Sequence, residues 1–155
     1  MSTIRIARPQ EAQALSALCR RSKAHWGYDA QFMRLSEAAL AVPRALIEHG
    51  LVLVAEDADG APLGIASVDA LERQGEFDLA HFFVEPAAFG TGVGRTLFAA
   101  AVALAKAKGA RRLIILSDPN AAAFYARMGA VEIGDAPSDA IPGRRLPLLR
   151  YEIER

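Results

Sequence analysis

The stretch FFVEPAAFGTGVGRTLF, residues 82–98, places three glycines at alternate positions between an apolar run and a long alanine-rich segment. The alanine-rich segment has the composition of a helix. Each glycine at a helix start loses backbone entropy on folding and costs about 1 kcal/mol of helix propensity relative to alanine. Gly90, Gly92 and Gly94 therefore need a compensating role, and one such role is room for a ligand to approach the backbone N–H groups.

Length and composition limit the classes to which this chain can belong. Its 155 residues are expected to form one domain, 1–155, and 52% of them are hydrophobic, which is enough to bury a core. A formal net charge of zero argues against a nucleic-acid partner, and no apolar run reaches the roughly 18 residues that span a bilayer. The start of the chain has no signal-peptide pattern, so we expect a cytoplasmic protein with no membrane partner.

Cysteine and histidine usage argues against a disulfide and a structural metal site. The chain has one cysteine and three scattered histidines. Cys19 falls on the apolar face of a predicted helix, beside Leu15 and Leu18, which favours a buried core thiol over a covalent acyl-enzyme nucleophile. We therefore expect chemistry that needs no metal.

Outward from the glycines, hydrophobic periodicity alternates between strand and helix along the whole chain. Strands are predicted at 4–6, 51–56, 62–71, 77–84, 111–116, 131–133 and 146–153. Helices are predicted from Pro9 on, over 36–50, from the glycines to about Lys108, and over 118–129. Ser36 and Asp118 are the expected helix caps, and Pro43 would kink or split the second helix. This order implies one mixed sheet with helices on both faces.

Two known phosphate-binding glycine motifs do not fit. A dinucleotide fingerprint, G-x-G-x-x-G, needs a third glycine where the chain has Arg95. A P-loop, G-x-x-x-x-G-K-[ST], needs glycine at Phe89 and lysine at Arg95. A glycine-rich turn without any ligand is the remaining alternative, although three glycines in five residues is costly for chain reversal alone.

The pattern that does fit is V-x-P-x-x-x-G-x-G-x-G-x-x-L, here VEPAAFGTGVGRTL at residues 84–97. It resembles the GNAT superfamily of acyl-coenzyme-A-dependent N-acyltransferases, and the order of strands and helices extends the resemblance to nearly the whole chain. The resemblance implies an α/β fold with a single mixed, mostly antiparallel sheet, splayed between strands 4 and 5. It also implies that the loop AAFGTGVG, residues 87–94, binds the pyrophosphate of acetyl-CoA.

The resemblance assigns most of the site to the coenzyme. Backbone N–H groups at a helix N-terminus form an anion site, to which threonine hydroxyls and Arg95 add donors. The strand-4 backbone would pair with the pantetheine arm, and Asn120 would hydrogen-bond the amides of that arm or else its own local backbone. Phe89 stands where the family usually has Gln or Arg, which predicts weaker binding. The expected cofactor-binding residues are Phe82, Phe83, Val84, Phe89, Gly90, Thr91, Gly92, Val93, Gly94, Arg95, Thr96, Asn120 and Phe124.

The resemblance also supplies the catalytic candidates. Tyr125 lies in AAAFYARMG, residues 121–129, where the family's tyrosine protonates the departing thiolate as a general acid. For the base, strand 4 offers Glu76, Asp78 and His81, of which we favour Asp78, with a solvated charge as the alternative for each. Strict alternation places Glu76 and Asp78 on one face of the strand and His81 on the other.

The residues that bind the acyl acceptor are harder to identify from the sequence than those that bind the coenzyme. Trp26 and Tyr28 lie in a break between the first two predicted helices, where the family has its acceptor pocket, and they suit a flat or cationic substrate or plain packing over the sheet edge. The resulting hypothesis is an acetyl-CoA-dependent N-acetyltransferase that acts on a primary amine of a small molecule or peptide by direct transfer. The alternative is a catalytically weak coenzyme-A-binding sensor or interaction module. The segment 141–153 is a candidate homodimer edge.

Overall fold

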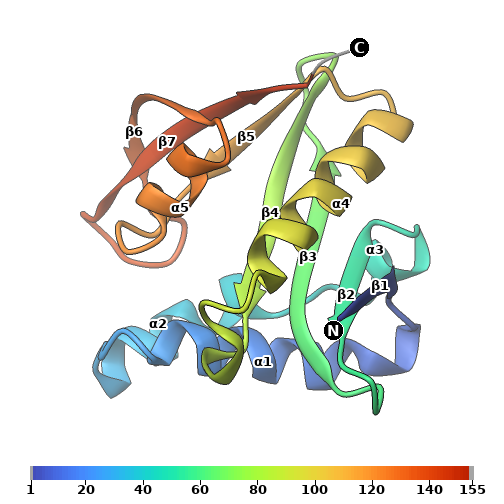
Figure 1. Cartoon of the computed structure of the whole chain (residues 1–155). Coiled ribbons are helices and arrows are strands. Elements are labelled where there is room, and N and C mark those ends of the chain that lie inside the picture. The colour runs from blue at the N-terminus through green and yellow to red at the C-terminus, as the bar shows by residue number, and fades with distance from the viewer. Residues whose placement is uncertain (1, 154–155) are drawn as a thin grey trace.

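The computed structural model describes residues 2–153, and its strands form one seven-stranded sheet in the order β1-β2-β3-β4-β5-β7-β6 (Figure 1). Every neighbouring pair is antiparallel except β4 and β5, so the predicted mixed, mostly antiparallel sheet is confirmed. The strands are β1 (Thr3–Ile6), β2 (Val52–Glu56), β3 (Pro62–Ala70), β4 (Glu76–Val84), β5 (Arg112–Leu116), β6 (Val131–Pro137) and β7 (Arg145–Glu152).

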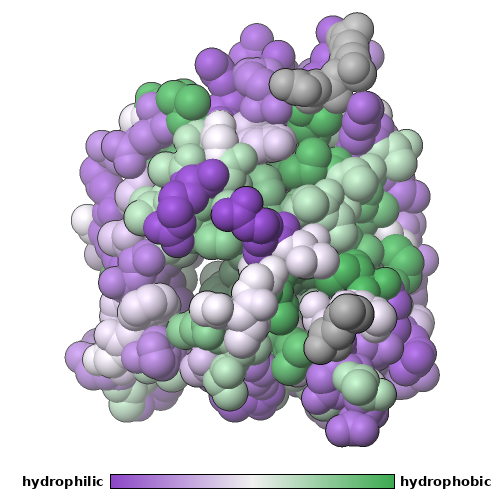
Figure 2. Space-filling view, viewed as in Figure 1, coloured by the Kyte–Doolittle hydropathy of each residue, from purple (hydrophilic) through white to green (hydrophobic). Residues whose placement is uncertain are grey.

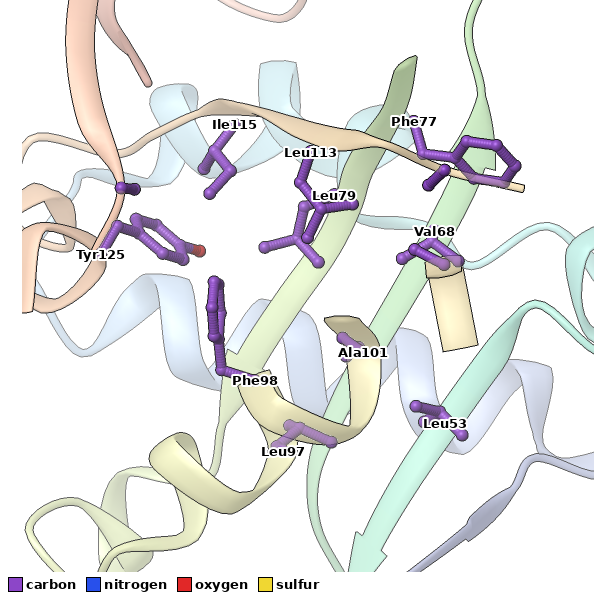
Figure 3. Close-up of a cluster of buried hydrophobic side chains, with 14 of the residues drawn as sticks. Leu53, Val68, Phe77, Leu79, Leu97, Phe98, Ala101, Leu113, Ile115 and Tyr125 are labelled. Atoms are coloured by element: carbon purple, nitrogen blue, oxygen red, sulfur yellow. The ribbon is translucent and has the colours of Figure 1, made fainter. Parts of the chain in front are cut away.

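Helices cover both faces of the sheet, as predicted. The α4 helix packs on one face over β2, β3 and β4, and α1 packs on the opposite face of β3 and β4. Two buried clusters result, a larger one under α4 and α5, shown in Figure 3, and a smaller one under α1. The helices are α1 (Ala12–Ala24), α2 (Ala30–Leu40), α3 (Arg44–Glu48), α4 (Val93–Ala107) and α5 (Ala122–Arg127), with short 3₁₀ turns at Pro9–Glu11 and Pro86–Ala88.

The parallel contact between β4 and β5 is short. It consists of three residue pairs, the last of which is Asp78 with Ile114. Beyond Asp78 the two strands diverge, and β5, β6 and β7 swing away from the rest of the sheet (Figure 1). The predicted splay between strands 4 and 5 is therefore confirmed, and it leaves the main chain of β4 from 79 to 84 without a strand on that side.

A β-bulge in β4 changes which residues share a face. Leu79 pairs with Val68 and His81 pairs with Ser67, so Ala80 is an extra residue without a partner on β3. Before the bulge Leu79 packs into the α4 cluster, and after it Phe82 does. The predicted strict alternation is therefore wrong, because the bulge places Asp78 and His81 on the same face, toward α1.

The sequence-based helix boundaries are wrong on the α1 side. The second helix begins at Ala30, and its cap is Asp29, whose side chain accepts a hydrogen bond from the Phe32 N–H at 2.8 Å. Ser36 is instead buried inside that helix. Pro43 does break the predicted helix, since α3 starts directly after it. The helix cap is therefore Asp29, whereas the cap expected from the sequence is Ser36.

The C-terminal elements also differ from expectation. The α5 helix begins only at Ala122, and the Asp118 carboxylate binds the Asn120 N–H at 2.8 Å in a turn before it. The β6 strand extends from Val131 to Pro137 with a bulge near Gly134, much longer than predicted. Because β6 pairs outside β7, the predicted C-terminal edge segment lies inside the sheet, and β6 is the edge.

Candidate active site

A cleft of about 570 Å³ follows the divergence of β4 and β5. Its walls come from the C-terminal end of α1, the splayed part of β4, the glycine loop, the turn after β5, and α5. Figure 2 shows a recess between the two halves of the molecule, with strongly hydrophilic side chains above it on both sides. Arg95 on α4 and Arg127 on α5 both line this cleft.

The glycine loop presents bare N–H groups to the cleft. Gly92 is the N-cap of α4 with φ of +89°, and no side chain caps the helix. The first-turn N–H groups of a 15-residue helix are thus left without side-chain acceptors, with the positive end of the helix dipole behind them. Thr91 and Thr96 turn their hydroxyls to the carbonyl oxygens of Ala88 and Gly92, at 2.5 and 3.1 Å. Main-chain donors therefore dominate this part of the site.

Gly94 has a different role from the other two glycines. Gly90 and Gly92 both have positive φ, and a Cβ on either would meet no atom within 4 Å. Gly94 has ordinary helical φ, but a Cβ there would lie 3.2 Å from Cε1 of Phe124. Its missing side chain lets α5 approach α4, so packing accounts for Gly94, whereas Gly90 and Gly92 are required by their positive φ and keep the predicted role of leaving room for a ligand.

The structure brings most of the predicted coenzyme residues to one cleft. Thr91, Val93 and Thr96 are the exceptions: the two threonines are hydrogen-bonded within the loop, and Val93 is buried in the α4 core. The predicted residues that line the cleft are Trp26, Phe82, Phe83, Val84, Phe89, Gly90, Gly92, Gly94, Arg95, Asn120, Phe124 and Tyr125.

Tyr125 lies where the cleft meets the core. Its side chain is 6% exposed, and its ring contacts those of Phe82 and Phe98 at centroid distances of 5.8 and 6.2 Å. Figure 3 shows the hydroxyl pointing across the gap from α5 toward Leu79. Within residues 2–153 no group hydrogen-bonds to this hydroxyl. Burial raises the pKa of Tyr125, and the carboxylates of Asp118 and Asp78 raise it further.

The three candidate bases on β4 differ sharply in environment. Glu76 lies 3.5 Å from Arg112 and 3.8 Å from Arg73, an ion-paired position at the closed end of the splay. Burial, together with the charges of Asp139 and Asp69, raises the pKa of Asp78 to about 6. Asp78 does not line the cleft wall itself.

Both ring nitrogens of His81 form hydrogen bonds within the protein. Its Nε2 lies 3.0 Å from the Ala41 carbonyl oxygen and its Nδ1 lies 2.7 Å from the Ser67 hydroxyl. A carbonyl only accepts, so Nε2 carries a proton, and the serine hydroxyl donates to Nδ1 of the neutral ring. Burial lowers the pKa of His81, in keeping with the neutral form. This histidine ties β4 to the end of α2.

The two aromatic residues predicted to bind the acceptor, Trp26 and Tyr28, lie in different surroundings. Trp26 lines the cleft and stacks on Phe89 of the glycine loop at 6.0 Å, with His25 edge-on to both rings. Tyr28 does not line the cleft; it stacks on Phe32 at 3.9 Å and binds the Asp118 carboxylate at 2.8 Å. Phe89 therefore joins an exposed aromatic group at the rim.

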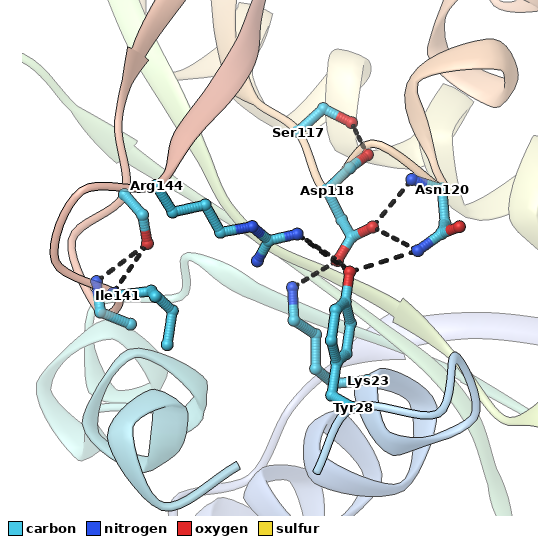
Figure 4. Close-up of polar contacts among 9 residues, drawn as sticks. Lys23, Tyr28, Ser117, Asp118, Asn120, Ile141 and Arg144 are labelled. Carbon is cyan, nitrogen blue, oxygen red and sulfur yellow. Dashed lines mark hydrogen bonds and ion pairs between the residues drawn. The ribbon is translucent and has the colours of Figure 1, made fainter. Parts of the chain in front are cut away.

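Asp118 is the centre of a polar network that we name the Asp118 clamp: Lys23, Tyr28, Asp118, Asn120 and Arg144 (Figure 4). Lys23 Nζ lies 2.5 Å from the carboxylate, and Arg144 lies 3.8 Å from it and 2.9 Å from the Tyr28 hydroxyl. Burial alone would raise the pKa of Asp118, but the hydrogen bonds from Lys23, the Asn120 N–H and Tyr28 outweigh it and lower that pKa.

Sequence analysis missed Lys23, Asp118, Arg127 and Arg144 as site residues. Lys23 and Arg144 lie 121 positions apart in the chain and come together around Asp118 and the rings of Tyr28 and Phe32. Asp118 was assigned to capping, which is what an aspartate before Pro119 suggests locally. The one available signal was the position of Lys23 just before Trp26 and of Arg127 just after Tyr125. A cation next to an aromatic residue is too common in sequences to identify a site.

Metal sites and membrane spans are both absent from the part of the chain that the structure describes. Among residues 2–153 no group of three or more His, Cys, Asp or Glu side chains is placed to hold a metal ion. In the same part of the chain, every helix is too short or too polar to cross a membrane.

Known proteins provide an independent comparison. Residues 48–129, just over half of the chain, match the family model for the acetyltransferase (GNAT) domain. A GCN5-related N-acetyltransferase structure from Rhodopseudomonas palustris superposes with a TM-score of 0.75 at 26% identity, covering 98% of this chain and 96% of that one.

Two similar structures contain the coenzyme. YncA from Salmonella typhimurium, solved with acetyl-CoA, has a TM-score of 0.72 at 21% identity over 100% of this chain and 95% of its own. The PaiA N-acetyltransferase from Thermoplasma acidophilum, solved with coenzyme A, has a TM-score of 0.76 at 15% identity over 98% of this chain and 99% of its own. At these identities the likeness concerns the fold.

Proposed function

Because the chain belongs to the GNAT acetyltransferase family, we propose that it transfers an acetyl group from acetyl-CoA directly to a primary amine of a small molecule or peptide. The observation that carries this proposal is the cleft itself. It runs from the uncapped N-terminus of α4, through the gap between β4 and β5, to the hydroxyl of Tyr125. The coenzyme-bound neighbours share this fold.

The residues present fit acetyl-CoA, which supplies the reactive thioester when bound. The first-turn N–H groups of α4 would hold its pyrophosphate, with Arg95 and Arg127 as the cations of the same cleft. The unpaired main chain of 79–84 is an internal sheet edge that would hydrogen-bond an extended amide-containing arm. Phe124 and Asn120 would flank that arm.

Tyr125 would act as the general acid. Its raised pKa keeps the phenol protonated at neutral pH, and no protein group in the described chain competes for its proton. As the amine nitrogen bonds to the carbonyl carbon and the carbon–sulfur bond breaks, Tyr125 would donate its proton to the departing sulfur. The phenolate would then regain a proton from solvent in the cleft.

Asp78 would accept the proton that the amine loses. With a pKa of about 6 it is ionised at neutral pH but remains basic enough to take a proton. Since it does not line the cleft, it would act through water. We expect kcat/KM to fall below about pH 6 with an apparent pKa that disappears in Asp78→Asn.

Release of thiol from acetyl-CoA over a panel of amines tests the proposal. Amine-dependent release is the expected result. Tight binding of acetyl-CoA without turnover of any amine would instead favour a coenzyme-binding sensor, the alternative that Phe89 and the water-mediated base leave open.

We also propose a homodimer, now through β6. This edge strand exposes Val131 and Ile133, which are 61% and 45% accessible, so a second copy has an apolar strand to pair with. Light scattering at micromolar concentration should give twice the chain mass of 16.6 kDa. A monomer there would refute the dimer.

A further inference from the structure

The Asp118 clamp lies beside the cleft, where α1, the turn after β5 and the loop between β6 and β7 meet. Lys23, Asp118 and Asn120 all line the cleft. Arg144, from the loop between β6 and β7, does not line it but lies next to this wall, where it contacts Asp118 and Tyr28 (Figure 4). The coenzyme, on the proposed function, occupies the glycine-loop side. An acceptor therefore approaches from the side of the clamp.

The clamp carries an excess positive charge. Lys23 and Arg144 surround a single carboxylate, and the side chains of Lys23, Asp118 and Arg144 are only 13%, 12% and 20% exposed. Two cations and one anion at low exposure leave a net charge of +1 that water screens poorly. Asp139, on the same loop as Arg144, makes no ion pair with it among residues 2–153.

The carboxylate of Asp118 has no capacity left. One oxygen accepts from Lys23 Nζ and the Tyr28 hydroxyl, at 2.5 and 2.8 Å. The other accepts from the main-chain and side-chain nitrogens of Asn120, at 2.8 and 2.9 Å. Four donors fill the lone pairs of a carboxylate, so Asp118 has no position left for a hydrogen bond from Arg144, which stays 3.8 Å away.

Arg144, by contrast, has donors to spare. Its Nη2 contacts Tyr28 and Asp118, whereas Nε and Nη1 have no hydrogen-bond partner among the described residues. The guanidinium lies 4.9 Å from the centre of the Phe32 ring and 5.2 Å from that of Tyr28, which restrains it. A restrained guanidinium with two open N–H edges suits an incoming carboxylate.

From this charge balance we propose that Lys23 and Arg144 bind a carboxylate of the acyl acceptor, so that the acceptor is an amino acid rather than a simple cationic amine. The inference rests on the proposed acetyl transfer and deepens it. Lys23, Asp118 and Tyr125 line the same cleft of about 570 Å³, so a compact molecule can place its carboxylate at the clamp and its amine toward the Tyr125 hydroxyl. A purely cationic acceptor would meet two like charges beside Tyr28 and Phe32.

The experiment compares L-amino acids with their C-terminal amides and their decarboxylated amines as acceptors, measured by thiol release. We expect kcat/KM for the acids to exceed that of both partners by about 30-fold, the scale of one charge-assisted hydrogen bond. Arg144→Gln and Lys23→Gln should remove this preference by lowering kcat/KM for the acids alone, and Arg144→Lys should retain part of it. Amides or amines used as well as the acids would overturn the inference.

Arg145→Gln is the matched control. Arg145 is the next residue, its side chain is 59% exposed, and it pairs with Asp135 outside the cleft. The control should keep the acid preference, and all variants should keep the wild-type affinity for acetyl-CoA. An Arg145→Gln loss equal to that of Arg144→Gln would refute a specific site.

A binding measurement separates the inference from the proposed function. Calorimetric titration of the coenzyme-loaded protein with the same acids and amides needs no turnover. Acid binding that Arg144→Gln weakens at least about 10-fold, without turnover of any amine, would support the carboxylate site while refuting the proposed catalysis. Equal binding of acids and amides would overturn the carboxylate site whether or not catalysis occurs.

Discussion

The two ends of the cleft are built in opposite ways. The proposed coenzyme end relies chiefly on main-chain groups of 79–96, namely the open edge of β4 and the bare N-terminus of α4, with Asn120, Phe124 and Arg127 added from beyond β5. The proposed acceptor end is assembled from three separate segments, 23–28, 118–120 and the loop that holds Arg144, and relies on side chains held around Asp118. A backbone site is tied to the fold, whereas a side-chain site can change its specificity by substitution.

Tyr125 lies between the two ends, and its removal should have the largest effect. Tyr125→Phe deletes one oxygen with little loss of packing and should lower kcat by about 10²–10⁴-fold while acetyl-CoA affinity stays the same. Tyr151→Phe is the control, because Tyr151 packs on the same Phe98 ring but does not line the cleft. A fall in kcat below about threefold at saturating amine would exclude Tyr125 as the acid.

The backbone character of the coenzyme end is tested at Gly92. A side chain there must adopt φ of +89°, so Gly92→Val should distort the loop and weaken acetyl-CoA binding by about 100-fold, measured by calorimetry. Gly109→Val is a matched control, with φ of +103° and equally open surroundings at the other end of α4. Both variants should lose similar stability, but only the first should lose affinity. Equal affinities would show that the loop is an ordinary turn.

Burying the ionised carboxylate of Asp78 near Asp139 and Asp69 has a cost in stability. An acid whose pKa rises from 3.8 to about 6 on folding holds its proton more tightly when folded, so stability falls as pH increases through that range. Asp78→Asn should therefore raise the free energy of unfolding at pH 7.5 by about 3 kcal/mol and have only a small effect near pH 4. Denaturant titrations at both pH values measure this difference. A variant that is destabilised at pH 7.5 would show that the ionised carboxylate is stabilising.

The smallest effect is expected at the rim, where the two ends meet. Phe89 stacks on Trp26, so Phe89→Gln exchanges this contact for a side-chain donor beside the glycine loop. We expect acetyl-CoA affinity to rise by about threefold, since one exposed hydrogen bond contributes about 0.5–1.5 kcal/mol. Phe89→Ala, which removes the ring without adding a donor, is the control. Affinity that falls equally in both variants would mean that the ring itself binds the coenzyme.

The predictability of the two ends follows from their construction. The order of strands and helices along the chain, the mixed sheet and the splay were predicted, because each depends on neighbours in sequence or on the family resemblance, whereas the position of β6 at the sheet edge was not. The clamp was not predicted, since Lys23 and Arg144 become neighbours only when α1 and the β6–β7 loop meet at Asp118. The errors inside the predicted regions have local causes, namely a cap at Asp29 and an overlooked role for Gly94 as packing space.

The bulge at Ala80 reverses which face of the sheet each later side chain of β4 points to. Because side chains alternate with period two, one extra residue exchanges inside and outside for everything that follows it. Deleting Ala80 would turn Phe82 toward the α1 cluster and Phe83 toward the α4 cluster, the reverse of their present packing, without changing any other residue. Single-residue length changes at this point should therefore be far less tolerated in evolution than substitutions on either side, since they reassign both the core and the catalytic groove at once.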